Sequence, residues 1–269
     1  HEIATGFNGP IGIDHHSPTN TVVVSVNYGS GSPVALERIL PNGNHVGFSA
    51  LNGVLDEVKI ATIRGGALNQ GGFAIGDLYV GNGADGEIVR VSANGLTIVD
   101  PWISLPGSGN GLIRGSLYHD RTGVFGGDLI VCTTLGQVWR ITSGATTSAS
   151  PLAAIGTHLE GLCTIPNDSA KYGPLAGKIV CGAEQQGLLY AIDAAGTVTS
   201  YDFDVDIEDI DLIPWGQNFY GVNFGVQKIL GVDASEFASV AGDILLTQEI
   251  HTGSGLHRRR VLLGHPALG

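Results

Sequence analysis

The sequence is poor in charge and contains no methionine. Charged residues make up 14% of its 269 residues, and the chain has only 13 Lys and Arg in total. This scarcity of Lys, Glu and Arg argues against a helical bundle, because those residues are strong helix formers. The apolar content of 43% argues against intrinsic disorder. No run of apolar residues is long enough for a membrane span, so none is expected.

Basic residues are scarcer than acidic ones, and the formal net charge is −12. A field of that sign repels nucleic acid and attracts metal cations, so we expect no nucleic-acid partner. The chain opens at His1 with no visible signal peptide. We interpret it as a mature or trimmed form and expect an extracellular or periplasmic location.

Cysteine is also scarce. Cys132, Cys163 and Cys181 lie inside apolar runs without CxxC spacing, which predicts buried thiols. A disulfide between Cys163 and Cys181 is the alternative, because the two residues could lie on neighbouring strands.

Glycine is abundant, with 42 residues, and it punctuates an internal repeat. The repeated unit is a short apolar strand, a polar turn and a second strand, which is typical of a β-hairpin. Clear copies span 76–91, 127–141 and 177–192, and weaker copies span 20–40, 217–232 and 242–261.

A second element precedes most hairpins, and a polar strand follows several of them. The preceding segments align without gaps and start at Pro10, Glu57, Arg114, Glu160 and Glu208, with spacings of 47, 57, 46 and 48 residues. Four strands in each unit of this length are typical of a β-propeller blade. We therefore predict an all-β, single-domain propeller over residues 1–269. Six blades are expected, with five as the main alternative and a β-sandwich as a lesser one.

The two ends of the chain indicate how the ring closes. Residues 1–7 resemble an outer strand that leads directly into the first inner strand, whereas the hairpin at 242–263 lacks an outer strand. We expect the N-terminal strand to complete that last blade. The spacing between Val232 and Gly242 is too short for two strands, and residues 234–240 are expected to form a helical turn instead.

The starts of the inner strands are the best candidates for a functional site. In a propeller these positions meet near one axis, so Glu57, Glu160 and Glu208 are expected to converge. Crowded carboxylates raise one another's pKa unless a cation intervenes, and oxygen ligands suit Ca²⁺. The alternative is a metal-free network in which Arg114 pairs with the acids.

Hairpin turns on the same face offer further ligands, and one histidine lies nearby. The turn residues are Asn27, Asn82, Glu184, Asn223 and Glu249. No pair of histidines among them has zinc spacing, which disfavours Zn²⁺. His158 precedes Glu160 by two residues and is the best candidate for a general base.

Together, the blade repeats and the glutamates at the inner-strand starts resemble two groups of propellers. One is the gluconolactonase, paraoxonase and strictosidine-synthase superfamily, and the other is the virginiamycin B lyase group. In lactonase relatives a Glu with Asn and Asp residues holds one Ca²⁺ in the channel. The resemblance implies that role for Glu57, Glu160 and Glu208, with Asn82 or Asn223 as helpers.

Two function classes follow from these observations. The first is a metal-dependent hydrolase or lyase that acts on a small ester, lactone or sugar acid. In it the metal polarises a carbonyl oxygen, Arg114 holds an anionic group and His158 moves a proton. The alternative is a non-catalytic extracellular binding or scaffold propeller that recognises a glycan or a protein. The non-equivalent residues around the axis favour one asymmetric site and hence the enzyme. The sequence leaves the oligomeric state open.

Overall fold

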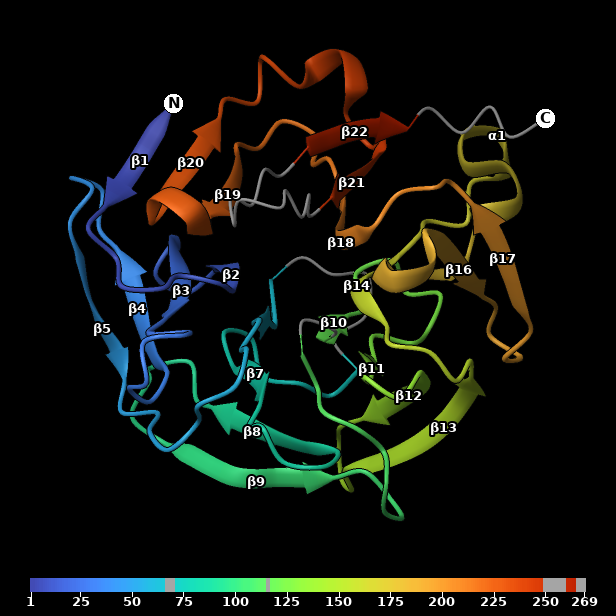
Figure 1. Cartoon of the computed structure of the whole chain (residues 1–269), viewed down its shortest axis with the longest axis horizontal. Helices are drawn as coiled ribbons and strands as arrows, with labels where there is room; N and C mark the ends of the chain where they lie inside the picture. The colour runs from blue at the N-terminus through green and yellow to red at the C-terminus, as the bar shows by residue number, and fades with distance from the viewer. Residues whose placement is uncertain (66–70, 115–116, 249–259, 265–269) are drawn as a thin grey trace.

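The structure is a computed structural model that describes residues 1–65, 71–114, 117–248 and 260–264. Its sheets stand around a central axis, as Figure 1 shows in a view down the ring. The all-β propeller predicted from the repeats is therefore confirmed.

Four blades are four-stranded antiparallel meanders in which the strands follow chain order from the axis outward (Figure 1). The first contains β2 (Ile13–His16), β3 (Thr21–Val26), β4 (Ala35–Ile39) and β5 (His45–Ser49). The second contains β6 (Ala61–Thr62), β7 (Leu78–Gly81), β8 (Glu87–Val91) and β9 (Ile98–Ser104). The third contains β10 (Leu117–His119), β11 (Leu129–Cys132), β12 (Gln137–Thr142) and β13 (Ser148–Ala154). The fourth contains β14 (Glu160–Thr164), β15 (Ile179–Ala183), β16 (Leu188–Ile192) and β17 (Val198–Asp202).

The fifth blade is built differently. Its inner strand β18 (Ile207–Leu212) pairs with β21 (Ile244–Gln248), which pairs with β22 (Arg260–Gly264). The intervening hairpin, β19 (Phe219–Asn223) and β20 (Lys228–Val232), leaves this blade and forms a separate three-stranded sheet. Five blades thus begin with one of the five aligned inner segments, which corresponds to the alternative count and not to the preferred six.

The N-terminal strand β1 (Glu2–Thr5) pairs with a different strand from the one predicted. It pairs with β20, with Ala4 opposite Ile229, and not with the hairpin at 242–263. The reason is proximity: β1 leads directly into the first blade, and the β19–β20 hairpin packs against that blade. Phe7, Val24 and Ile229 share one buried cluster at this contact.

Helical segments are short and lie in the connections. They are α1 (Ser169–Tyr172), η1 (Gly173–Leu175), η2 (Glu184–Gln186), η3 (Phe224–Val226) and η4 (Ala238–Val240). The last of these confirms the helical turn expected before the final hairpin. Within the described ranges, no helix is long and apolar enough to cross a membrane.

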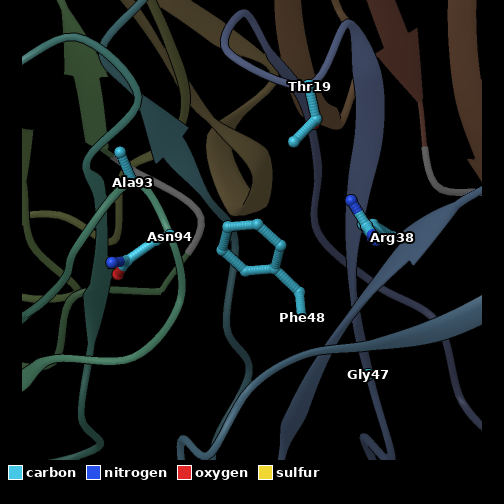
Figure 2. Close-up of a pocket in the computed structure, with 6 residues that line it drawn as sticks. All are labelled: Thr19, Arg38, Gly47, Phe48, Ala93 and Asn94. Carbon is cyan, nitrogen blue, oxygen red and sulfur yellow. The ribbon is translucent and has the colours of Figure 1, made fainter.

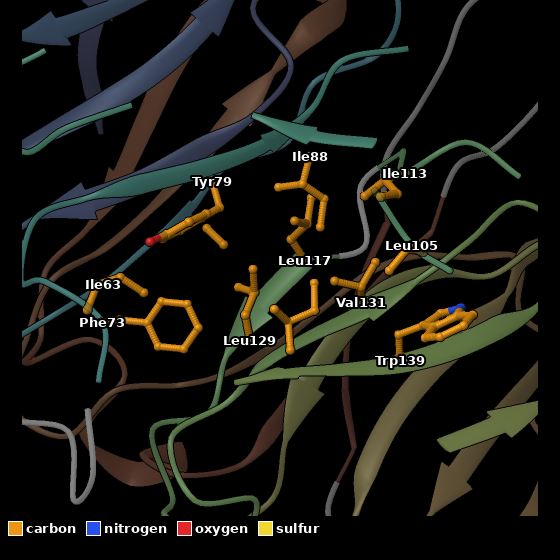
Figure 3. Packing of buried hydrophobic residues seen from close by; sticks show 12 residues of the cluster. Ile63, Phe73, Tyr79, Ile88, Leu105, Ile113, Leu117, Leu129, Val131 and Trp139 are labelled. Carbon is orange, nitrogen blue, oxygen red and sulfur yellow. The ribbon is translucent and has the colours of Figure 1, made fainter. Parts of the chain in front are cut away.

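Apolar strands form the core where neighbouring blades face each other. In β11 all four residues are buried, which explains its unbroken apolar run. Figure 3 shows one such contact, where Tyr79 and Ile88 of the second blade face Leu129 and Val131 of the third. All three cysteines are buried free thiols, as predicted.

Candidate functional site

Three carboxylates from separate segments meet near the axis. Glu160 begins β14, Glu184 begins η2, and Glu208 is the second residue of β18. One carboxylate oxygen of each lies within 4.8 Å of the others. Glu160 and Glu208 are buried and Glu184 is partly exposed. The structure therefore joins two of the glutamates expected at inner-strand starts to one of the turn residues.

The third predicted glutamate, Glu57, lies beside a cation that the sequence analysis missed. Lys59 Nζ is 3.6 Å from Glu208 Oε1 and 3.9 Å from Glu57 Oε1, and it donates to the Glu208 carbonyl oxygen at 3.4 Å. The Glu57-Val58-Lys59 pattern was the available signal, because alternate residues of an extended segment share a face. The chain thus supplies one buried positive charge of its own to the acids.

The pKa values of Glu57 and Lys59 are both raised, for different reasons. Burial, together with the nearby Glu160 and Glu208, raises the pKa of Glu57 to about 7 in spite of Lys59. Burial alone would lower the pKa of Lys59, but the surrounding carboxylates outweigh it and raise that pKa above its ordinary value. Lys59 is therefore a permanent cation here, whereas Glu57 exchanges a proton near neutral pH.

His158 and Glu160 form a close pair at the same mouth. His158 Nε2 lies 3.0 Å from Glu160 Oε1. The interaction with the Glu160 carboxylate raises the pKa of His158, against the opposing effect of burial. Burial raises the pKa of Glu160, but His158 and Lys59 outweigh it and leave that pKa below its ordinary value. A carboxylate thus lies beside the imidazole, an arrangement that suits a proton-transfer group.

Arg114 pairs with Asp56, the residue before Glu57. Its guanidinium lies 2.8 Å from Asp56 Oδ1, and it lowers the pKa of Glu57 by its charge. Together, the side chains around the mouth carry more negative than positive charge. The acids are Asp56, Glu57, Glu160, Glu184, Glu208 and Asp209, and the permanent cations are Lys59 and Arg114.

The asparagines predicted as helpers lie in the second blade and in the three-stranded sheet. The Asn82 amide donates to Glu87 Oε2 at 2.8 Å and to Asp100 Oδ1 at 2.9 Å within the second blade. Asn223 ends β19 in the three-stranded sheet. Asn27 bonds to Asn8 and to the Pro33 carbonyl group. Glu249 lies outside the described residues.

Gly161 follows Glu160 where β14 closely approaches the next blade. The residue has φ +61°, and it lies at a register shift between Glu160 and Leu162. A Cβ on Gly161 would lie 2.8 Å from the Asp209 Cα of the next blade. Glycine is required here for two reasons, the left-handed backbone and the close approach of β18.

We expect Gly161→Ala to destabilise the fold by about 2 kcal/mol or more, because it combines strain at positive φ with a backbone clash. Gly29→Ala is the matched control, since Gly29 has φ +71° but nothing within 4 Å of its Cβ position. Urea unfolding of both variants separates the two effects. Equal losses in the two variants would show that the approach of β18 imposes no constraint.

A second charged network lies at the other end of the inner strands. The Asp14 carboxylate pairs with Arg64 and with Arg121, whose Nη2 is 3.4 Å from Asp14 Oδ2, and it accepts from the Thr62 amide at 2.8 Å. Burial raises the pKa of Asp14, but the two arginines outweigh it and bring that pKa below its ordinary value. Asp211 of β18 lies in the same network. Burial and Asp209 raise its pKa to about 7 in spite of the arginines.

Comparisons with known proteins identify the fold of this chain, but they do not assign it to a family. No protein-family model matches the sequence, and no curated protein matches it. A virginiamycin B lyase from Staphylococcus aureus aligns over 82% of this chain with a TM-score of 0.52 and 13% identity. An auxiliary nutrient binding protein from Bacteroides ovatus aligns over 86% with a TM-score of 0.56 and 10% identity. A gluconolactonase from Xanthomonas campestris aligns over 86% of this chain and 88% of its own length, with a TM-score of 0.48 and 11% identity.

The alignments span 64% of the lyase chain and 61% of the nutrient binding protein. At such low identities the likeness establishes the fold alone, because one fold hosts many activities. The resemblance to virginiamycin B lyase propellers inferred from the sequence is thereby confirmed at the level of fold. Both lyase and nutrient-binding proteins are among the structural neighbours.

Proposed function

We propose that Glu160, Glu184 and Glu208 bind a divalent cation, with Ca²⁺ as the best match. The observation that carries this proposal is the approach of three carboxylate oxygens within 4.8 Å, from three segments distant in sequence. The donors fit a hard cation, because Ca²⁺ binds carboxylate oxygens in flexible geometry. Lys59 and Arg114 offset only part of the negative charge around the mouth, which leaves an attraction for a cation.

The chemistry that this site supports best is that of a metal-dependent hydrolase or lyase for a small ester, lactone or sugar acid. A bound Ca²⁺ would supply Lewis-acid polarisation of a substrate oxygen. His158 would accept or donate a proton at Nδ1, because its Nε2 faces Glu160 at 3.0 Å. Arg114 is partly exposed at the rim and would hold an anionic group of the substrate. An extracellular or periplasmic location, where Ca²⁺ is abundant, belongs to the same proposal.

Glu184→Gln tests the cation site with the least damage to the fold, because Glu184 is the more exposed of the three. Added Ca²⁺ is expected to raise the Tm of the wild-type protein, since a ligand that binds only the folded state stabilises it. Loss of one carboxylate ligand should weaken Ca²⁺ binding about tenfold or more, as measured by calorimetry.

Glu236→Gln is the control, because Glu236 is an exposed acid outside the cluster. It should bind Ca²⁺ like the wild type. A wild-type Tm that Ca²⁺ leaves unchanged would reject the cation site and leave the network of acids with Lys59 and Arg114.

The second candidate is a non-catalytic propeller that binds a glycan or a protein. It is favoured by Lys59, which already neutralises part of the acid cluster, and by the nutrient-binding neighbour. His158→Gln discriminates between the candidates once a substrate is found. Loss of turnover with retained binding supports the enzyme, whereas unchanged behaviour supports the binding protein.

A further inference from the structure

A second candidate site lies far from the acid cluster, at the outer seam between the first and second blades. A cavity of about 210 Å³ is lined there by Thr19, Arg38, Gly47, Phe48, Ala93 and Asn94. Figure 2 shows the Phe48 ring in the middle, with Arg38 on one side, Asn94 on the other and Thr19 above. The lining therefore combines a cation, an aromatic face, a hydroxyl and an amide.

Arg38 differs from the other arginines whose side chains the structure describes. Each of the others lies within ion-pair distance of a carboxylate; these are Arg64, Arg90, Arg114, Arg121 and Arg140. The Arg38 guanidinium has no such partner in the described ranges, although the chain as a whole carries a net charge of −12. A partly buried guanidinium keeps five N–H donors and favours the two oxygens of a carboxylate.

The walls of the cavity are held in place by local structure. His16 packs edge-on against Phe48, with ring centroids 5.0 Å apart, and fixes the aromatic face. The turn that carries Asn94 packs directly onto the backbone of Phe48. A Cβ on Gly95, which has φ +74°, would lie 1.9 Å from the Phe48 carbonyl oxygen. This seam is thus a preformed part of the fold.

The polar groups of the wall point to a hydroxylated ligand. Asn94 Oδ1 accepts from the Leu96 amide at 3.0 Å and from Ser92 Oγ at 2.7 Å, so these bonds within the turn use its oxygen and not its NH₂ donors. Thr19 Oγ1 lies 2.7 Å from His16 Nδ1 and 2.7 Å from Thr21 Oγ1. An amide and a hydroxyl on either side of an aromatic ring suit the alternating hydroxyls and C–H groups of a sugar.

We propose that this seam binds the carboxylate form of a single sugar unit, a uronic acid. The carboxylate lies on the Arg38 guanidinium, the C–H face of the ring packs on Phe48, and the hydroxyls reach Asn94 and Thr19. A cavity of about 210 Å³ has room for one sugar unit. The site is separate from the acid cluster and stands whether or not that cluster binds a cation.

The test is calorimetric titration of the whole chain with sodium galacturonate, with galactose and sodium benzoate as comparison ligands. Galacturonate is expected to bind with the highest affinity, because galactose lacks the carboxylate and benzoate lacks the hydroxyls. Arg38→Gln should weaken galacturonate binding about tenfold or more. Arg38→Lys should weaken it by less, since lysine keeps the positive charge but lacks the paired N–H donors of the guanidinium. Asn94→Ala should weaken the binding of galacturonate but not the binding of benzoate.

Two variants serve as controls. Lys228→Gln removes a positive charge at a distant exposed pair with Glu2, and Glu184→Gln alters the acid cluster. Both should bind galacturonate like the wild type, so failure of this proposal is distinguishable from failure of the cation site. Absence of galacturonate binding, equal binding by Arg38→Gln, or binding of benzoate as tight as that of galacturonate would each overturn the proposal.

Discussion

Replacing Lys59 with methionine is expected to lower the free energy of unfolding by about 3 kcal/mol at pH 7, because removal of one partner leaves buried charges uncompensated. Lys59 Nζ lies 3.6 Å from Glu208 and 3.9 Å from Glu57, and all three side chains are largely buried. The substitution keeps most of the apolar stem, so the loss reports the charge and not a cavity. Urea unfolding at constant pH measures it.

The loss of unfolding free energy in Lys59→Met should become smaller as pH falls. Without Lys59 the pKa values of the neighbouring carboxyls rise in the folded protein, so protonation at lower pH relieves their repulsion. Ca²⁺ should restore part of the stability at pH 7 if the acids bind it, because the ion replaces the missing positive charge. Lys228→Met is the matched control, since this exposed lysine pairs with Glu2 at 2.6 Å. Its replacement should lower the free energy of unfolding by less than about 1 kcal/mol. A Lys59→Met protein as stable as this control would show that Lys59 does not hold the acids together.

Asp14→Asn is expected to cost about 3 kcal/mol at pH 7, because it leaves Arg64 and Arg121 without their shared carboxylate. The folded-state pKa of Asp14 lies below its ordinary value of 3.8. The stability that it contributes is therefore complete above pH 3.8 and is lost as pH falls through the folded-state pKa. The difference between wild type and variant should close in acid, as pH falls through the folded-state pKa of Asp14.

Asp211→Asn, in the same network, is a control for which the opposite change in stability is expected. The pKa of Asp211 is about 7 in the folded protein against 3.8 as its ordinary value. The folded state thus retains a proton that the unfolded state has lost, and wild-type stability falls as pH rises across that window. Asp211→Asn lacks this fall, so it should gain stability relative to wild type between about pH 4 and 7. If both variants showed the same pH dependence, the contrasting surroundings of the two aspartates would be refuted.

The sequence predicted the elements of the fold closely, because strands and turns are encoded by local patterns. The starts of the inner strands β14 and β18 were identified at Glu160 and Glu208, whereas β6 begins at Ala61, after the predicted Glu57. The helical turn before β21 followed from a segment too short for two strands. The likeness to virginiamycin B lyase propellers was also evident at this stage, because it depends on the repeat and not on individual side chains.

The candidate site was predicted only in part. Glu160 and Glu208 meet and Glu184 joins them, whereas the Asn82 amide bonds to Glu87 and Asp100. Lys59 follows Glu57 by two residues, but its second partner could not be predicted: Glu208 is distant in sequence, and only the packing of β18 brings its carboxylate to the ammonium group. Gly161 offered no signal among so many glycines, since its constraint is the backbone of the next blade.

By itself, the sequence determined an all-β propeller and the axial position of its acidic residues. Apolar alternation and turn residues act within one hairpin, and their period repeats from blade to blade. Only the tertiary structure decided that β1 pairs with β20, that five blades carry an inner strand, and which charges touch. These outcomes depend on how whole blades are staggered around the ring, and contacts between blades join residues whose separation in the chain carries no local pattern.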